Sequence, residues 1–375
     1  MVVTIIILNE NGRAYKIIYI LSQVGEYPTK SVYLLGENAN KEQRRIHDMT
    51  LPQTYLNPKT GEKIEAKILN ISGNGKTKTI RLSKQAIPIL EWMGVREEYE
   101  KTSDKFRSDN RIDRNHRVAE VYVMFRRAGM EIQKEGAADE NRYPLLYYAK
   151  SNTDIDKCIS EQNEKVMFTR IIGLLLNTGV CMAVYNTRDT VMKWVGESEY
   201  KAKLAFQKTS LKITETDAVL DCLLFGKNYE VGRKMIESPS EKNTAQKNKL
   251  NEYSFFRIYR KVYFVPLSDF GVKLLGLLAK PDIDRKLIDI LIPKESQRSG
   301  YGAFEFDGTL DGNYVFSFLN SDISRLERLR IAMELGVRAE IICFPEQVEY
   351  VQDMFGKYNV KISTVDIDDV IRLLK

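Results

Sequence analysis

Cysteine and histidine are scarce in this sequence, and their scarcity argues against metal chemistry. The chain of 375 residues contains four cysteines and two histidines. No CxxC or CxxH pair occurs, so the spacing of a structural zinc site is missing. The cysteines lie far apart in apolar stretches, which is typical of small buried side chains in a reducing compartment. We therefore expect no bound metal and no other cofactor.

Long hydrophobic runs are also missing. The longest ones, such as residues 2–8 and 171–176, are far too short to cross a bilayer. The sequence does not start with the charged segment and cleavage site of a signal peptide. We expect a cytoplasmic protein with no membrane partner.

Common enzyme motifs do not occur either. The chain has no GxxxxGKS/T phosphate loop, no GxGxxG after a strand, no HExxH and no GxSxG. With two histidines it also lacks the histidine cluster of metal-dependent relaxases. We therefore favour a protein that is not an enzyme. The enzymatic alternative, a magnesium-dependent nuclease, depends on carboxylates near the C-terminus.

Apolar residues and a mild positive charge are what the sequence does contain. Hydrophobic residues make up 43% of the chain, whose length is sufficient for two or three domains with their own cores. The net charge is only +6, but residues 59–84 carry seven basic and two acidic side chains. An anionic partner would therefore meet the first part of the chain.

Three short helices are predicted in the first 50 residues. Apolar positions recur at helical spacing over residues 13–24, and Gly25 ends that helix. A second helix is expected from Pro28 to residue 35. Asn40 is expected to cap a third helix that reaches Thr50. This succession is typical of a helix-turn-helix.

A hairpin and a closing helix follow. Residues 63–71 alternate as a half-exposed strand, Gly73-Asn74-Gly75 predicts a turn, and residues 78–82 predict the return strand. A helix over residues 84–93 comes next. A helix-turn-helix followed by such a hairpin indicates the winged form of the fold.

The third helix and the hairpin carry side chains suited to DNA. A helix fits the major groove, which is about 12 Å wide, and basic side chains on a hairpin would reach flanking phosphates. Ile46 and Met49 are expected to face inward. The candidate DNA-binding residues are Lys41, Gln43, Arg44, Arg45, His47, Lys63, Lys76, Lys78, Arg81, Arg114 and Arg117. In the alternative interpretation, the winged unit is a protein-interaction module whose lysines only protect a solvated strand edge.

A helix capped by Asp113 is expected to carry the sequence RNHRVAEVYVMFRRAG of residues 114–129. His116 and Arg117 near its start are either a candidate anion site or polar residues opposite the core. This segment and TIRLSKQAIPILEW at residues 79–92 resemble the replication-relaxation family of plasmid and mobile-element proteins.

The resemblance implies a double-stranded DNA-binding protein that serves the replication or transfer of a mobile element. A relaxase or a replication protein would then be a partner. We also expect a homodimer, because one winged helix offers limited affinity and palindromic half-sites are the usual remedy.

Strands and helices alternate in the rest of the chain, around a polar loop near residues 238–251. A hairpin over residues 303–319 is followed by helix, strand, helix and strand, and Asp322 is expected to cap the first of these helices. This order of elements resembles that of the PD-(D/E)xK nuclease core, in which carboxylates hold magnesium and a lysine orients water.

Glu305, Asp307 and Asp311 are the candidate carboxylates of that alternative. The strand expected to supply the E-x-K motif reads YVFSFLN and has no charged residue. We therefore expect a degenerate restriction-endonuclease-like core, with turn residues at Asp307 and Asp311.

The predicted fold class is α+β. A winged helix-turn-helix domain is expected in residues 1–96, a charged linker and connecting helix in residues 97–142, and a mixed α/β domain in residues 143–375. Within the second segment, residues 97–110 are the linker proper. The predicted function is sequence-specific or structure-specific binding of double-stranded DNA in the replication, transfer or regulation of a plasmid, phage or other mobile element.

Overall fold

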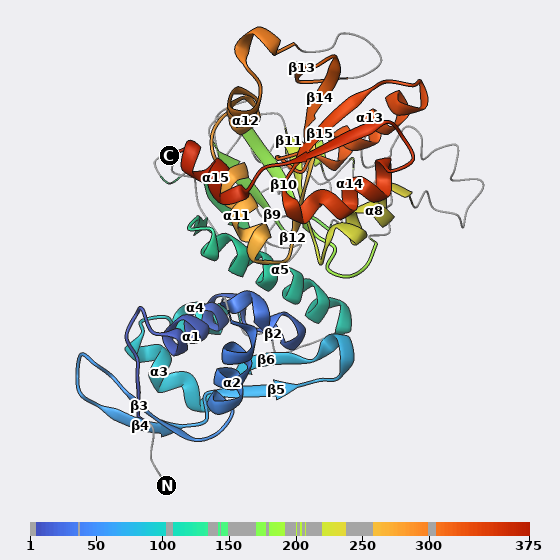
Figure 1. The fold of residues 1–375 in the computed structure, drawn as a ribbon. Helices are drawn as coiled ribbons and strands as arrows, with labels where there is room; N and C mark the ends of the chain where they lie inside the picture. The colour runs from blue at the N-terminus through green and yellow to red at the C-terminus, as the bar shows by residue number, and fades with distance from the viewer. Residues whose placement is uncertain are drawn as a thin grey trace. The chain divides into compact units, whose positions relative to one another are not determined.

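Helices and strands alternate along the chain in the computed structural model, and the strands form several separate sheets (Figure 1). This mixture of helix and strand agrees with the expected fold class at that coarse level. The structure describes residues 5–36, 38–102, 108–133, 142, 144–148, 170–177, 180–191, 200, 203–204, 207, 220–237, 258–298 and 305–375.

The chain divides into two compact units, Met1–Met124 and Phe125–Lys375. The helices that begin in the first unit are α1 (Arg13–Val24), η1 (Thr29–Leu35), α2 (Ala39–Met49), η2 (Gly75–Thr77), η3 (Lys84–Ala86), α3 (Ile87–Trp92), α4 (Arg96–Thr102) and α5 (Asp109–Arg127). Its strands are β1 (Ile5–Ile7), β2 (Tyr27–Pro28), β3 (Gln53–Leu56), β4 (Lys63–Ala66), β5 (Leu69–Ser72) and β6 (Thr79–Leu82).

These strands form two small sheets, in the orders β1-β3-β4 and β2-β6-β5. The stretch of residues 63–71, predicted as one strand, is divided between them. The break lies at Lys67, whose backbone N–H donates to Gln85 Oε1 at 2.7 Å and whose carbonyl accepts from the Ser83 hydroxyl. Side chains from η3 and its cap therefore take the backbone groups that a continuous ladder would use.

Helix α2 begins earlier than the sequence suggested. Asn38, not Asn40, is the capping residue, because its backbone is extended and its Oδ1 accepts from the Lys41 N–H at 3.0 Å. Asn40 lies inside the helix. The expected inward positions are confirmed, since Ile46 and Met49 are both buried.

Part of the predicted linker is helical and packed. Helix α4 covers residues 96–102, and the buried Thr102 donates through its hydroxyl to the Ser22 carbonyl of α1 at 2.9 Å. The connecting helix α5 then starts at Asp109 rather than after Asp113. Asp113 is not a cap: it lies within the helix and pairs with Arg117 at 2.7 Å.

Buried polar contacts fix α5 to the first unit. The Nδ2 of Asn115 donates to Glu26 Oε1 at 2.8 Å, and the Ser31 hydroxyl donates to Glu120 Oε1 at 2.5 Å. Glu26 also accepts from the Thr79 hydroxyl of β6 at 3.4 Å. Both carboxylates are buried, and buried carboxylates require such donors. Residues 109–124 are thus an integral part of this unit.

The second unit contains two sheets. Its strands are β7 (Glu131–Gln133), β8 (Leu145–Tyr148), β9 (Gly173–Asn177), β10 (Val180–Asn186), β11 (Leu220–Gly226), β12 (Val262–Pro266), β13 (Gly308–Leu310), β14 (Asn313–Ser317), β15 (Ala339–Cys343) and β16 (Val360–Thr364). The orders are β12-β11-β10-β9-β8-β7 and β13-β14-β15-β16. Pairing is parallel in β10-β11-β12 and in β14-β15-β16. Except for the edge strand β16, these strands consist mainly of buried apolar residues.

The described helices of this unit are α8 (Tyr229–Glu237), α11 (Asp269–Leu278), α12 (Ile283–Leu291), η5 (Lys294–Ser296), α13 (Ile323–Glu334), η6 (Pro345–Gln347), α14 (Val348–Phe355) and α15 (Ile367–Leu373). Asp322 caps α13, as predicted, and its Oδ1 also accepts from the Val262 N–H of β12 at 3.1 Å. This carboxylate therefore connects the start of α13 to β12, the edge strand of the six-stranded sheet. The polar loop predicted near residues 238–251 lies outside the described residues. Among those that are described, no helix combines the length and the apolar composition needed to span a membrane.

Candidate nucleic-acid interface

Helix α2 presents a polar face to solvent. Lys41, Gln43, Arg44 and His47 are exposed, as expected. With 3.6 residues per turn, positions 43, 44 and 47 share one side of the helix. Ile46 occupies the opposite, buried side. The chemistry of this face is that of side chains that pair with the edges of bases.

Arg45 differs from its neighbours on α2. It is half-buried, and its Nη1 lies 3.3 and 3.4 Å from the two carboxylate oxygens of Glu42, which is itself buried. The Arg13 guanidinium of α1 lies 3.8 Å from the same carboxylate. A buried carboxylate needs a cationic or hydrogen-bonding partner. Arg45 is therefore engaged in the packing of α2, whereas Arg44 points to solvent.

Gly36 lies directly beside this ion pair. A Cβ atom on Gly36 would lie 2.7 Å from Glu42 Oε1 and 2.8 Å from Arg13 Nη1. The chain between η1 and α2 thus passes close to the charged groups. This close approach fixes the start of α2 relative to α1.

The β5–β6 hairpin exposes its tip, including Lys76 and Lys78. The predicted turn is confirmed, since Gly73 and Gly75 have φ values of 79° and 53°. The base of the hairpin is attached to η1, because Thr29 donates to the Lys78 carbonyl through its N–H at 3.2 Å and its hydroxyl at 3.3 Å. This attachment brings the exposed Lys30 to the side of the hairpin. Sequence reasoning missed Lys30. Its place beside the hairpin results from the pairing of β2 with β6, whose paired residues lie 51 to 53 positions apart in the sequence.

The remaining predicted residues lie elsewhere. Lys63 is exposed on β4, opposite Leu56 of β3, and therefore belongs to the other hairpin. In Figure 1 the β3–β4 and β5–β6 hairpins extend in different directions from the helices of the unit. Arg81 on β6 and Arg114 and Arg117 on α5 are half-buried.

His116 is not at the start of α5, nor is it opposite the core. Its exposed fraction is 0%, and the helix starts seven residues before it, at Asp109. A fully buried imidazole cannot contact an external phosphate. Both interpretations of His116 from the sequence are therefore wrong: it is a core residue of the first unit.

Comparisons with protein-family models, with curated proteins and with solved structures find no match. The resemblance to the replication-relaxation family thus stays a prediction from residues 79–92 and 114–129. In the structure, Asn115 and Glu120 of the second segment are buried partners of Glu26 and Ser31. These two residues of the motif therefore attach α5 to the rest of the first unit.

The candidate carboxylates near the C-terminus have separate roles. Asp307 is buried and forms a two-pronged pair with Arg325, with both contacts at 2.8 Å, and it also accepts from the Ser317 N–H at 2.7 Å. Glu305 is exposed, 3.5 Å from Arg328. Asp311 is an exposed turn residue with a φ of 49°. Within the described part of the chain, no three or more His, Cys, Asp or Glu side chains form a group that could hold a metal.

Glu340 of β15 is a further buried carboxylate near the C-terminus, and sequence reasoning missed it. It pairs with Lys361 of the neighbouring strand at 3.1 Å and accepts from the Ser363 hydroxyl at 2.6 Å. The strand β14, as expected from its sequence, contributes no charged side chain. The buried carboxylates of Asp307 and Glu340 are thus committed to internal pairs.

A crevice of about 490 Å³ lies in the second unit, next to the ends of β11 and β12. Its lining is strongly charged, but Arg233 lies 2.8 Å from Glu230 and 4.0 Å from Asp353. The lining as a whole carries four acidic side chains and two basic ones, so acidic charge is in excess. The crevice therefore shows no preference for an anion.

Proposed function

We propose that the first unit is a winged helix-turn-helix that binds double-stranded DNA. Its elements include α1, β2, η1, α2, β5 and β6 in this order, with the strands β3 and β4 inserted between α2 and β5, and β2 pairs with β6. Without the β3–β4 insertion, this order would match the one expected of a winged helix, which supports the proposal. The observation that carries the proposal is the exposed polar face of α2 in the same unit as the lysine-bearing β5–β6 hairpin, which Thr29 attaches to η1.

Each part of this surface suits a different part of DNA. Gln43 and Arg44 are side chains that form two hydrogen bonds with adenine and guanine, respectively, in the major groove. Lys30, Lys76 and Lys78 are compact charges suited to phosphates on either side. Base contacts would specify the site, and phosphate contacts would position the protein.

The biological setting that we propose comes from the family resemblance. The protein would act in the replication or transfer of a plasmid, phage or other mobile element, or in its regulation. It would bind as a homodimer to paired half-sites and cooperate with a relaxase or a replication protein.

The test is fluorescence anisotropy with labelled duplex DNA at several salt concentrations. The double variant Lys76→Ala/Lys78→Ala should weaken binding on all sequences and lower the salt slope by up to about 2, because each lysine that neutralises a phosphate contributes about one. The variant Lys84→Ala/Lys101→Ala removes the same charge from exposed positions outside this hairpin and should change the slope little. An equal slope for wild type and the hairpin variant would refute the proposed role of the hairpin. No binding of wild type at low salt would favour the protein-interaction module.

A further inference from the structure

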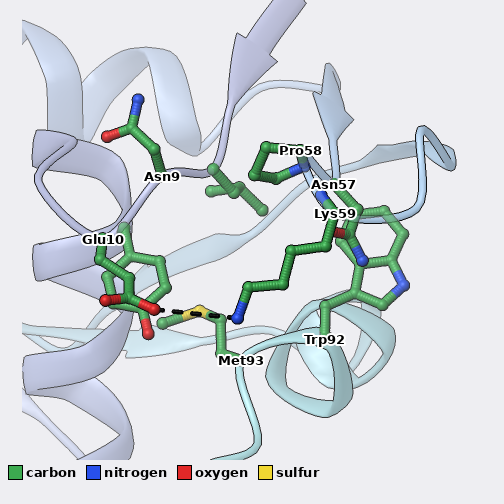
Figure 2. Close-up of a pocket in the computed structure, with 9 residues that line it drawn as sticks. Asn9, Glu10, Asn57, Pro58, Lys59, Trp92 and Met93 are labelled. Atoms are coloured by element: carbon green, nitrogen blue, oxygen red, sulfur yellow. Dashed lines mark hydrogen bonds and ion pairs between the residues drawn. The ribbon is translucent and has the colours of Figure 1, made fainter.

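A pocket of about 270 Å³ opens in the first unit and shares no residue with α2 or the β5–β6 hairpin (Figure 2). It is lined by residues 8–10 after β1, Tyr15 of α1, residues 57–59 after β3, and Trp92 and Met93 at the end of α3. Its size suits a molecule smaller than a typical drug, for which pockets of about 300–1,000 Å³ are usual.

One wall of the pocket is apolar and aromatic. Leu8 is buried, and Tyr15, Trp92 and Met93 are half-buried. The Trp92 Nε1 donates to Glu62 Oε2 at 3.1 Å, which fixes the plane of the indole. A flat apolar body would pack against this wall.

Opposite charges meet at the mouth. The Lys59 ammonium lies 3.9 Å from Glu10 Oε1, and in Figure 2 the lysine side chain extends across the pocket toward this carboxylate. Both side chains are highly exposed, at 78% and 73%. An exposed ion pair contributes little stability. The two charges can therefore separate at low cost to receive a ligand that carries both signs.

An amide group adds a third polar contact. Asn57 is 6% exposed and lines the pocket. Its Oδ1 accepts from the Lys59 N–H at 2.9 Å, which fixes the orientation of the amide. The Nδ2 of the same amide can then donate to a ligand oxygen in the pocket.

We propose that this pocket binds a free α-amino acid with an apolar or aromatic side chain. The ammonium group pairs with Glu10, the carboxylate with Lys59 and Asn57, and the side chain packs on Trp92. Because Glu10 and Lys59 lie close together, one small molecule that carries both charges on the same carbon atom can reach both side chains once the pair has separated. This inference goes beyond DNA binding and does not depend on it.

The experiment is a titration of the full chain with L-phenylalanine and L-leucine, by calorimetry and by tryptophan fluorescence. A Trp194→Phe background makes Trp92 the reporter, since these are the two tryptophans of the chain. We expect saturable binding of one molecule per chain, with a Kd of about 1 mM or lower. N-acetyl-phenylalanine and phenylalaninamide each keep one charge and should bind about tenfold more weakly. Glycine lacks the apolar group and should also bind more weakly.

Matched variants test the assignment. Glu10→Gln and Lys59→Met should each weaken phenylalanine binding by about fivefold or more. Glu65→Gln and Lys63→Met make the same changes on β4, outside the pocket, and should leave the affinity unchanged. The proposal is overturned if neither amino acid gives a saturable signal up to about 10 mM. It is also overturned if N-acetyl-phenylalanine binds as tightly as phenylalanine, or if the pocket variants bind like the controls.

Discussion

The Nδ2 of Asn115 in α5 donates to the buried Glu26 carboxylate at 2.8 Å, across 89 positions of sequence. The variant Asn115→Leu removes this donor from the buried Glu26 carboxylate, which the Thr79 hydroxyl contacts only at 3.4 Å. We expect the free energy of unfolding of the first unit to fall by about 1–3 kcal/mol. Chemical denaturation followed by circular dichroism measures it. The same substitution at the exposed Asn110 of α5 is the control and should be nearly neutral.

Arg44 and Arg45 should separate DNA binding from stability. Arg44 is exposed, so Arg44→Ala should weaken DNA binding and leave the unfolding free energy unchanged within about 0.5 kcal/mol. Among the described residues, Arg45→Ala leaves the buried Glu42 carboxylate with the Arg13 contact at 3.8 Å, and it should destabilise the protein by about 1–2 kcal/mol. Urea denaturation and anisotropy on the same two variants check this. Equal loss of stability for both would contradict the structural distinction.

Asp307 should act as a structural residue. The variant Asp307→Ala leaves the Arg325 guanidinium buried without its carboxylate, and we expect a loss of about 3–5 kcal/mol. Asp311→Asn in the exposed turn keeps a residue type that tolerates its positive φ and should cost no more than about 0.5 kcal/mol. Thermal and urea unfolding measure the difference. The interpretation fails if both variants have wild-type stability.

Asp221 of β11 should give the second unit a pH dependence. Burial raises the pKa of its carboxyl group above 3.8, the neighbouring Arg260 and Lys261 oppose the shift, and the Asp322 carboxylate adds to it. Between the unfolded and folded pKa values the folded state binds more protons than the unfolded state. Stability therefore falls as pH rises through that window.

The variant Asp221→Asn removes this titration. It should be more stable than wild type at pH values above the folded-state pKa of Asp221, and it should lose that advantage as the pH falls through that window and the wild-type carboxyl group becomes protonated. Urea denaturation at a series of pH values provides the test. Asp311→Asn, an exposed carboxylate, is the control and should follow the wild-type profile. A wild-type profile for Asp221→Asn would show that the shift does not contribute to stability.

Local sequence patterns predicted much of the fold. Helical periodicity placed Ile46 and Met49 in the core, the glycines at positions 73 and 75 marked a turn with positive φ, and Asp322 was correctly identified as a cap. Each of these depends on a few neighbouring residues. The division between β4 and β5 could not be predicted, because Gln85 and Ser83 take the backbone groups of Lys67 from 16 to 18 positions away.

The same limit applies to the candidate interface. The exposure of Lys41, Gln43, Arg44 and His47 follows from the period of α2. The engagement of Arg45 does not, because it depends on the burial of Glu42 against other helices. The burial of His116 could not be predicted either. It is a polar residue in a charged stretch of sequence, and its side chain lies in the core.

The docking of α5 sets the smallest fragment of this chain that can be expected to fold alone. A fragment that ends at residue 96 would lack the Asn115 donor and would uncover the Glu26 and Ser31 surface that α5 covers. Binding studies on the first unit should therefore use a fragment that extends to residue 124, the end of that unit. Failure of a shorter fragment to bind DNA would report on folding and would carry no information about the recognition surface.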